Sequence, residues 1–371
     1  MVKLTYVSPC LFGLESILAG ELKRMGAEDV KADNGKVEFS GDFHMMVRAN
    51  LGLRTAERVL IKLGSFQACN FEELFQGVKA IPLEDFIGKK DAFPVKGWSL
   101  NSTLHSIPDC QSIIKKAAVE RLKAHYGQEW FSETGPVHQI QFSILKDEVS
   151  IMLDTSGAGL HKRGYRQNAN EAPLKETLAA GIIDLARVKG NSIVCDPFCG
   201  SGTFLIEAAT KALNIPPCIR RKFVSQDWGL FDETIWREER ARGLELIRKD
   251  APFFGYGSDI DPKAVELTRA NAKKAGILAR VSIQTQDIKQ FAAKENMIVF
   301  SNPPYGERML EKKQAEQIYQ MMGKVFQKLP NSSYYIISPH EQFEKLFGRK
   351  ADKRRKLYNG MIKCQVFQYF K

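Results

Sequence analysis

The sequence predicts an α/β protein in which a Rossmann-like domain follows two smaller α+β modules. Four short strands are predicted in the C-terminal half, and a polar residue lies at or directly after the end of each one: residues 192–195, 253–258, 281–288 and 297–301. A turn with two glycines and an Ala-rich helix follow the first strand, which is the strand–turn–helix order of a cofactor-binding α/β sheet. The N-terminal half instead alternates short strands with amphipathic helices.

The first module is predicted over residues 1–64. Residues 13–26 place their apolar side chains on one helical face and end in a glycine. Residues 35–40 and 58–63 alternate as strands do, and a second helix over 43–51 lies between them. This rhythm indicates a small α+β unit.

The second module is predicted over residues 65–156. Residues 137–144 and 148–155 alternate and are joined by Lys146-Asp147, which predicts a hairpin. The remaining predicted elements are helices over residues 69–81 and 108–125 and a strand over 98–103. His125 and His138 have no partner at metal-ligand spacing, so we expect both to be structural or surface residues.

Composition describes an ordinary globular protein of 371 residues, with 44% hydrophobic and 26% charged residues. The formal net charge is +11, yet residues 1–160 hold 18 Lys/Arg against 20 Asp/Glu. The positive excess therefore lies in the C-terminal half, and it favours a polyanionic partner; a merely solvated basic surface is the alternative. The start of the chain has no apolar signal segment, and none of the seven cysteines forms a C-x-x-C pair. We expect a cytoplasmic protein with no membrane segment and no metal site, and the sequence gives no indication of oligomeric state.

Basic residues gather in three places that could contact a nucleic acid. A linker over residues 157–172 interleaves basic and aromatic side chains, which suits phosphate pairing and base stacking, although a bare hinge is the alternative. An insert over residues 214–250 is long enough to suggest a substrate-facing role. A basic run over 349–356 reads as a loop, either solvated or in contact with RNA. The candidate RNA contacts are Lys162, Arg163, Tyr165, Arg166, Arg220, Arg221, Arg354, Arg355 and Lys356.

The glycine turn over Asp196–Phe204 is the first predicted binding element. Its glycines allow close approach of a ligand, but the turn is neither G-x-G-x-x-G nor a P-loop, so a pyrophosphate is not expected. The acid before the glycines favours a cationic ligand, and S-adenosylmethionine, with its ammonium and sulfonium groups, meets that demand. An ordinary βα turn is the alternative. The candidate cofactor contacts here are Asp196, Phe198, Cys199, Gly200, Gly202 and Thr203.

Acids end the next two strands. Asp259 is placed to accept the hydroxyls of a ribose, with Ile260 beside it, whereas Asp261 is placed to cap the following helix. Asp287, with Ile288 after it, suits an adenine amino group.

The fourth strand ends in Asn302-Pro303-Pro304-Tyr305, which we predict to be the catalytic segment. The prolines remove two N–H donors and leave carbonyl acceptors, and the Asn302 oxygen adds another. The Tyr305 ring offers a stacking surface. Such a set suits a planar exocyclic amine, and Asn302 is also adjacent to the predicted cofactor site.

These four motifs resemble the loop, ribose, adenine and catalytic motifs of class I S-adenosylmethionine-dependent amino-methyltransferases. The linker segment Arg163–Arg166 and residues 172–176 are similar to the entry of the catalytic domain in THUMP-containing RNA guanine-N2 methyltransferases. The insert, with Pro216-Pro217, Arg220, Phe223 and Trp228, is most similar to the RlmL-like members. The resemblance implies a ferredoxin-like module, a THUMP RNA-binding module and a methyltransferase domain over residues 173–371. Some RlmL proteins are fused to a second methyltransferase, whereas this chain departs from that pattern with one catalytic domain, so we expect one methylation.

The function implied by the resemblance is methyl transfer to the exocyclic N2 of a guanine in RNA, with 23S rRNA as the expected substrate. A tRNA guanine is one alternative. The same tetrapeptide occurs in DNA adenine-N6 methyltransferases, so DNA is another. A noncatalytic RNA-binding assembly factor is the alternative outside enzymes.

Overall fold

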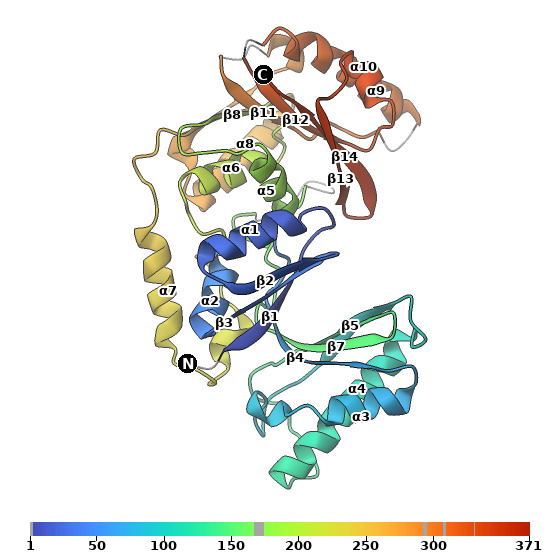
Figure 1. Ribbon diagram of the computed structural model, residues 1–371. Coiled ribbons are helices and arrows are strands. Elements are labelled where there is room, and N and C mark those ends of the chain that lie inside the picture. Colours follow the sequence, from blue (N-terminus) through green and yellow to red (C-terminus); the bar gives the residue numbers. More distant parts are fainter. Residues whose placement is uncertain (1–2, 167–173, 292–294, 307–308, 330) are drawn as a thin grey trace.

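The computed structural model describes residues 3–166, 174–291, 295–306, 309–329 and 331–371. The Ala172-Pro173 part of the resemblance lies outside these residues. The described chain forms two seven-stranded sheets, one N-terminal and one C-terminal (Figure 1).

The N-terminal sheet has the order β2-β3-β1-β4-β7-β6-β5. Its first half is built from β1 (Leu4–Pro9), α1 (Glu15–Met25), β2 (Glu28–Asp33), β3 (Lys36–Gly41), α2 (Phe43–Gly52) and β4 (Leu60–Gln67). The edge strand β2 is not among the predicted elements, because its residues are almost all polar and exposed. Pairing with β3 forms this strand, rather than any apolar alternation of its own.

The two predicted N-terminal modules share one sheet. Strand β4 pairs with β1 only through Leu60 and Ile61 and with β7 along most of its length. The predicted boundary at residues 64 and 65 therefore falls inside β4, where the pairing with β7 shifts register between Lys62 and Gly64. Strand β4 pairs with β7 on both sides of this boundary, so one strand belongs to both modules, which composition alone does not reveal.

The second half of the sheet contains the predicted hairpin. Lys146 and Asp147 connect its strands with φ values of 52° and 63°, as a tight hairpin turn requires. The predicted strand over 98–103 lies three residues earlier, because Val95–Leu100 pairs in parallel with β6. The elements are α3 (Phe71–Lys79), a 3₁₀ turn (Leu83–Asp85), β5 (Val95–Leu100), α4 (Ile107–Tyr126), β6 (Ile140–Leu145) and β7 (Glu148–Asp154).

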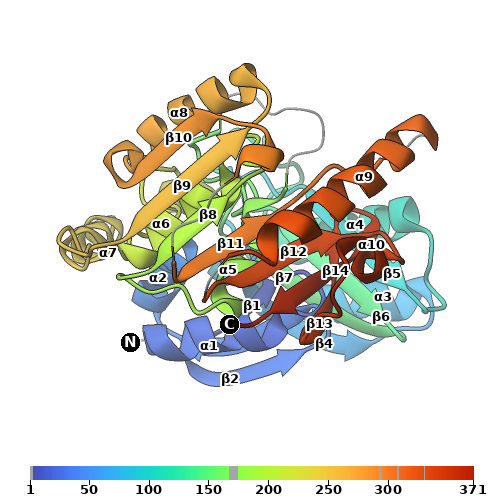
Figure 2. The same ribbon diagram turned by 90° about the horizontal axis from the view of Figure 1, so that it is seen from above.

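The C-terminal sheet has the order β10-β9-β8-β11-β12-β14-β13, and Figure 2 shows it from above. Strands β10, β9, β8, β11 and β12 run parallel, whereas β14 and β13 are antiparallel to their neighbours. The Rossmann-like prediction is confirmed. The elements are α5 (Glu176–Leu185), β8 (Ile193–Asp196), α6 (Thr203–Ala212), α7 (Thr234–Glu245), β9 (Phe254–Asp259), α8 (Pro262–Ala275), β10 (Val281–Thr285), β11 (Met297–Ser301), α9 (Met309–Phe326), β12 (Ser333–Ser338), α10 (Phe343–Phe347), β13 (Lys353–Asn359) and β14 (Ile362–Tyr369), with 3₁₀ turns at Val224–Asp227, Leu278–Arg280 and Ile288–Gln290.

Two apolar cores cover the faces of this sheet. Helices α5, α6 and α8 contribute to one core, and α9 and α10 to the other. Leu14 and Ile17 of α1 extend the first core, so the N-terminal module packs directly on the C-terminal domain. A Cβ at Gly181 of α5 would lie 2.6 Å from the Leu14 side chain, so only glycine allows this approach.

Much of the insert over residues 214–250 packs on the N-terminal modules, and its substrate-facing role stays a prediction. Helix α7 lies beside α2 (Figure 1). Phe223, Trp228 and Trp236 are buried in the N-terminal core, and the Trp228 indole donates to the Val137 carbonyl at 2.9 Å. The long insert thus connects the two sheets, and its aromatic residues belong to the N-terminal core.

The basic run over residues 349–356 is also not a loop. From Lys353 onward it forms the edge strand β13, paired with β14. Lysine and arginine side chains on an edge strand discourage pairing with other chains, so this composition is compatible with a strand.

Candidate active site

The predicted site residues meet at the carboxyl ends of the parallel strands. Asp196 ends β8, Asp259 ends β9 and Asn302 follows β11. Strands β9 and β11 lie on opposite sides of β8, so the order of the strands reverses here. Ligands of open α/β sheets bind at such a switch point. Asp287 follows β10, one strand further out.

The glycine turn is tied to the end of β9. The Gly200 N–H donates to the Asp259 carboxylate at 2.9 Å, and the Asp261 N–H donates to its other oxygen at 3.1 Å. Gly202 has a φ of 82°, and a Cβ there would lie 2.7 Å from the Thr268 methyl group. Gly200 has open space where a Cβ would point. The turn therefore presents bare backbone beside a carboxylate that retains free lone pairs, which fits a ribose.

Asp196 is 2% exposed and accepts the Phe198 N–H at 3.1 Å. Burial, with a smaller contribution from the nearby Asp259 carboxylate, raises the pKa of its carboxyl to about 8. A buried acid without a cationic partner holds its proton. A cationic ligand at this edge would favour the ionised form, which fits the ammonium and sulfonium groups of S-adenosylmethionine.

The neighbouring turns place the remaining predicted cofactor contacts. Asp261 caps α8 by accepting the Lys263 N–H at 2.9 Å, as predicted. Asp287 accepts the Lys289 N–H at 2.9 Å and so begins a 3₁₀ turn. Ile260 is 70% exposed at the site, whereas Ile288 is half-buried against the core under α9. Cys199 and Thr203 are buried, and Phe198 is half-buried.

The catalytic segment is held by two tyrosines. The Tyr305 hydroxyl donates to Asn302 Oδ1 at 2.7 Å, and the Tyr319 hydroxyl donates to the Pro304 carbonyl at 2.9 Å. Among the described residues none donates to the Pro303 carbonyl, so that acceptor and one lone pair of Asn302 Oδ1 stay available. These are the two acceptors predicted for an amine.

The Tyr305 ring is half-buried rather than fully exposed, and its stacking role stays a prediction. Its side chain packs against the core of the C-terminal domain, and its hydroxyl lies 3.5 Å from Asn359 Nδ2 and 4.0 Å from Cys364 Sγ. Burial raises the pKa of this hydroxyl, so Tyr305 stays neutral and acts as a donor. The Tyr305 side chain points inward because the β13–β14 hairpin supplies it with partners. Nothing in the sequence indicates that this hairpin lies beside the tetrapeptide.

The structure contradicts the predicted RNA contacts of Arg163 and Tyr165, because both side chains are buried. Arg163 lies 3.5 Å from the Glu207 carboxylate and donates to the Leu160 carbonyl at 2.8 Å. Burial is the largest single effect and lowers the pKa of Arg163, but the combined influence of Glu207, Cys218, Tyr165 and Glu176 outweighs it and raises the pKa. The Tyr165 hydroxyl donates to Glu207 at 3.2 Å. The linker is anchored to α6 through these bonds.

Arg166 and Arg221 also have structural partners. Arg166 pairs with Glu176 at 3.2 Å and donates to the Thr203 hydroxyl at 2.6 Å, so it connects the linker to the cofactor turn. Arg221 donates to linker carbonyls, including that of Gly159 at 2.8 Å. Both are therefore corrected from RNA contacts to residues that hold the linker.

The other basic candidates remain accessible. Lys162, Arg220, Arg354 and Lys356 are exposed. Arg354 pairs with Glu344, whereas Arg355 is half-buried and donates to the Gly13 carbonyl at 2.9 Å, which joins β13 to the N-terminal module. Arg355 is thus a module contact, and the four exposed residues stay candidates for RNA.

Sequence reasoning missed several residues that position the site: Glu207, Thr268, Tyr319, Asn359 and Cys364. Only Glu207 carried a signal, as the one acid within an otherwise apolar helix face. His138 is buried against Trp228, with ring centroids 4.4 Å apart, and burial lowers its pKa to about 4, which agrees with a structural role.

Two searches bear on other kinds of site. In the part of the chain that the structure describes, no three metal-ligating side chains gather. No described helix is both long and apolar enough to cross a membrane. All seven cysteines are free thiols.

The fold, the glycine turn and the row of strand-end acids define a class I methyltransferase that uses S-adenosylmethionine. The chain belongs to the family described as "RMKL-like, methyltransferase domain", whose model matches residues 163–368. Models of the RlmL ferredoxin-like domain and the THUMP domain match residues 5–60 and 68–154. The predicted three-part organisation and RlmL-like resemblance are confirmed, and the protein is an RNA methyltransferase of this type.

Named relatives cover the whole chain. A "Putative RNA methyltransferase YpsC" of Bacillus subtilis is 44% identical and covers 100% of this chain and 97% of its own. A "Ribosomal RNA large subunit methyltransferase K/L" of Psychromonas ingrahamii is 33% identical over 99% of this chain, which spans only 50% of that protein.

Solved structures agree with the fold. A possible methylase from Clostridium difficile is 42% identical with a TM-score of 0.96, covering 99% of this chain and 98% of that one. A structure titled as a predicted N6-adenine-specific DNA methylase from Listeria monocytogenes is also 42% identical, with a TM-score of 0.95 and coverage of 100% and 97%. A putative methyltransferase, SMU.472, was solved with SAH; it is 39% identical, with a TM-score of 0.94 and coverage of 100% and 98%.

Proposed function

We propose that this protein transfers one methyl group from S-adenosylmethionine to the exocyclic N2 of a guanine in RNA, with 23S rRNA as the substrate. The observation that carries the proposal is the pair of free acceptors on the catalytic segment, Asn302 Oδ1 and the Pro303 carbonyl. An exocyclic amine brings two hydrogens, and two acceptors at the switch point match them. The printed name of the Psychromonas relative supports the choice of ribosomal RNA.

The residues of the chain would act mainly by positioning. Asp259 and Asp287 would hold the ribose and adenine, and Asp196 would favour the cationic end of the cofactor. When bound, the cofactor would supply a methyl group activated by its sulfonium. The amine nitrogen would attack that carbon in line as the S–C bond breaks, and S-adenosylhomocysteine would be the leaving group. Asn302 and the Pro303 carbonyl would aim the amine lone pair, the kind of orientation that gives large effective molarities. The amine would lose its proton to water after transfer, so no histidine or cysteine base is needed.

The target base would have to leave its stack to reach these acceptors. Exposed cations at Lys162, Arg220, Arg354 and Lys356 are the candidates for backbone contacts. An enzyme that modifies rRNA would work in the cytoplasm.

Nucleoside mass spectrometry of a strain that lacks this gene tests the substrate. We expect N2-methylguanosine to fall in 23S rRNA and to return when the wild-type gene is supplied. If N2-methylguanosine is lost from tRNA alone, tRNA and not rRNA is the substrate. Loss of N6-methyladenine from DNA alone would favour the activity named for the Listeria structure. An unchanged set of modified nucleosides would contradict enzymatic activity and favour an assembly factor.

The purified protein tests the residue that carries the proposal. Asn302→Ala should lower single-turnover methylation of RNA from the deletion strain by about a hundred- to thousandfold, the usual cost of losing one hydrogen-bonding group at a reacting centre. Cofactor affinity by calorimetry should stay near that of the wild type, because Asp259 and Asp287 lie on other strands. A variant that retains more than about a tenth of the rate would exclude the amine-holding role.

A further inference from the structure

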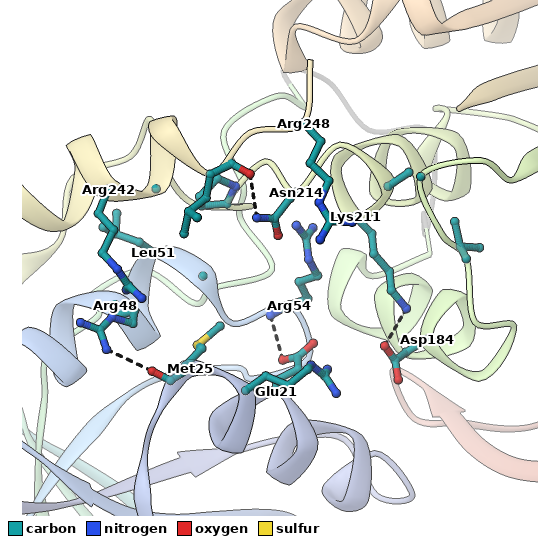
Figure 3. A pocket seen from close by; sticks show the side chains of 18 of the residues that line it. Glu21, Met25, Arg48, Leu51, Arg54, Asp184, Lys211, Asn214, Arg242 and Arg248 are labelled. Atoms are coloured by element: carbon teal, nitrogen blue, oxygen red, sulfur yellow. Dashed lines mark hydrogen bonds and ion pairs between the residues drawn. The ribbon is translucent and has the colours of Figure 1, made fainter. Parts of the chain in front are cut away.

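A pocket of about 520 Å³ lies between the ferredoxin-like module, the catalytic domain and the insert of that domain (Figure 3). Helices α1 and α2 of the ferredoxin-like module line one side, the ends of α5 and α6 another, and the insert helix α7 the third. Gly190 and Lys189, in the turn before β8, also line it. The pocket is therefore at the amino end of β8, whereas Asp196 and the cofactor turn are at the carboxyl end.

The lining is strongly basic. Seven basic and three acidic side chains line the pocket. The acids are already engaged: Glu239 binds Arg48 and Arg242, and Asp184 binds Lys211 at 2.6 Å. Glu21 is buried and accepts backbone N–H groups of Arg54 and Thr55.

Several positive charges are left without an acidic partner. Within the described residues, the side chains of Arg24, Lys189 and Arg248 form neither an ion pair nor a hydrogen bond. The Arg54 guanidinium bonds to neutral groups of α6 and the segment after it, including the Ile215 carbonyl at 2.6 Å. Figure 3 shows Arg54 and Arg248 pointing into the middle of the pocket from opposite sides. A recess with low-dielectric walls concentrates this positive potential.

We propose that this pocket binds a phosphate group. Guanidinium groups match phosphate oxygens in pairs, and ammonium groups add charge from the side. The volume lies within the range of about 300–1,000 Å³ that small-molecule sites occupy. Two sources have this chemistry: a backbone phosphate of the RNA, which rests on the proposed function, and a free phosphate-bearing small molecule, which does not. A phosphate held here would bridge the ferredoxin-like module, the insert and the catalytic domain.

The test compares two pairs of charge-removing substitutions in the full-length protein. Lys189→Gln with Arg248→Gln removes two cations from the pocket. Lys273→Gln with Lys274→Gln removes two exposed cations from the end of α8, which does not line the pocket. For each pair we would measure the slope of log RNA affinity against log salt, and also bind inorganic pyrophosphate by calorimetry.

If the phosphate comes from RNA, the slope of the pocket variant should become shallower by about 0.7–0.9, the value for one phosphate contact. If it comes from a small molecule, the RNA slope stays the same, but pyrophosphate binds the wild type and control while the pocket variant loses about tenfold or more in affinity, roughly 1.4 kcal/mol. Equal behaviour of the two pairs in both measurements would overturn the proposal. Because neither measurement uses methylation, these results stay interpretable even if the proposed activity fails.

Discussion

The carboxyl edge of the C-terminal sheet and the junction around Arg163 are both built from charged residues that are distant in sequence. At the edge, each side chain directly follows its own strand, and parallel pairing brings Asp196, Asp259 and Asn302 into one row. At the junction, Arg163 reaches carbonyls of Leu53 and Leu160 and the Glu207 carboxylate, which come from three different segments.

The difference in exposure separates their roles. Asp259 and Asn302 are half-buried and keep free acceptors, so they can meet a ligand. The side chains of Arg163 and Glu207 are each 1% exposed and form an ion pair at 3.5 Å. Variants at the junction should therefore act on stability, and variants at the edge on binding or turnover.

The largest effect is expected from Glu207→Ala at the junction. Its removal leaves the Arg163 charge buried without a partner, which typically costs about 3–5 kcal/mol of unfolding free energy. Urea denaturation measures this loss of unfolding free energy, with Glu238→Ala on the exposed side of α7 as the control. A loss no greater than that of the control would mean that the junction is not a buried ion pair in solution.

The junction also marks the limit of what the sequence could predict. The row of strand-end residues followed from apolar runs and the glycine turn, because a parallel sheet fixes where its strands end. Basic and aromatic residues in the linker predicted RNA contact. Composition does not tell whether an arginine contacts RNA or pairs with a buried carboxylate. Glu207 lies 44 residues after Arg163, within an Ala-rich helix, and nothing in the sequence joins them. The packing of the insert could not be predicted for the same reason, since Trp228 and Trp236 are core residues of the other sheet.

The second largest effect is expected at the edge, from Asp259→Ala. Losing charge-assisted hydrogen bonds to the ribose should weaken the binding of S-adenosylmethionine by about 1.5–3 kcal/mol, a loss of roughly ten- to hundredfold in affinity. The matched Asp259→Asn variant keeps the shape and one acceptor, so its loss should be smaller. Calorimetry measures both, and wild-type affinity in Asp259→Ala would exclude the ribose-holding role.

A third prediction concerns pH and the Asp196 carboxyl, whose pKa is about 8 in the folded protein against an ordinary 3.8. Between these values the folded state holds a proton that the unfolded state has lost, so this group makes stability fall as pH rises from about 4 to about 8. The slope is at most about 1.4 kcal/mol per pH unit. Unfolding without cofactor should therefore become less pH-dependent in Asp196→Asn than in the wild type. Identical pH profiles of the two proteins would show that Asp196 is ionised in the folded state.

The smallest effect is expected from Tyr305→Phe, and it tests whether the edge depends on buried support as the junction does. The hydroxyl donates to Asn302 Oδ1 at 2.7 Å and sits beside Asn359 and Cys364 of the β13–β14 hairpin. Without it, Asn302 loses the bond that fixes its amide, a net contribution of about 0.5–1.5 kcal/mol. We expect turnover to fall roughly two- to tenfold with cofactor affinity unchanged, because the loss falls on the geometry of the reacting amine.

Tyr358→Phe is the matched control, because the Tyr358 hydroxyl, on the same hairpin, has no hydrogen-bond partner among the described residues. Its turnover should equal that of the wild type in single-turnover methylation with saturating cofactor. A Tyr305→Phe variant as fast as this control would mean that the ring of Tyr305, and not its hydroxyl, contributes to turnover. A raised KM for RNA with unchanged turnover would indicate base stacking after all. A loss in turnover alone would mean that the inward-turned hydroxyl, which the tetrapeptide did not reveal, orients the catalytic asparagine.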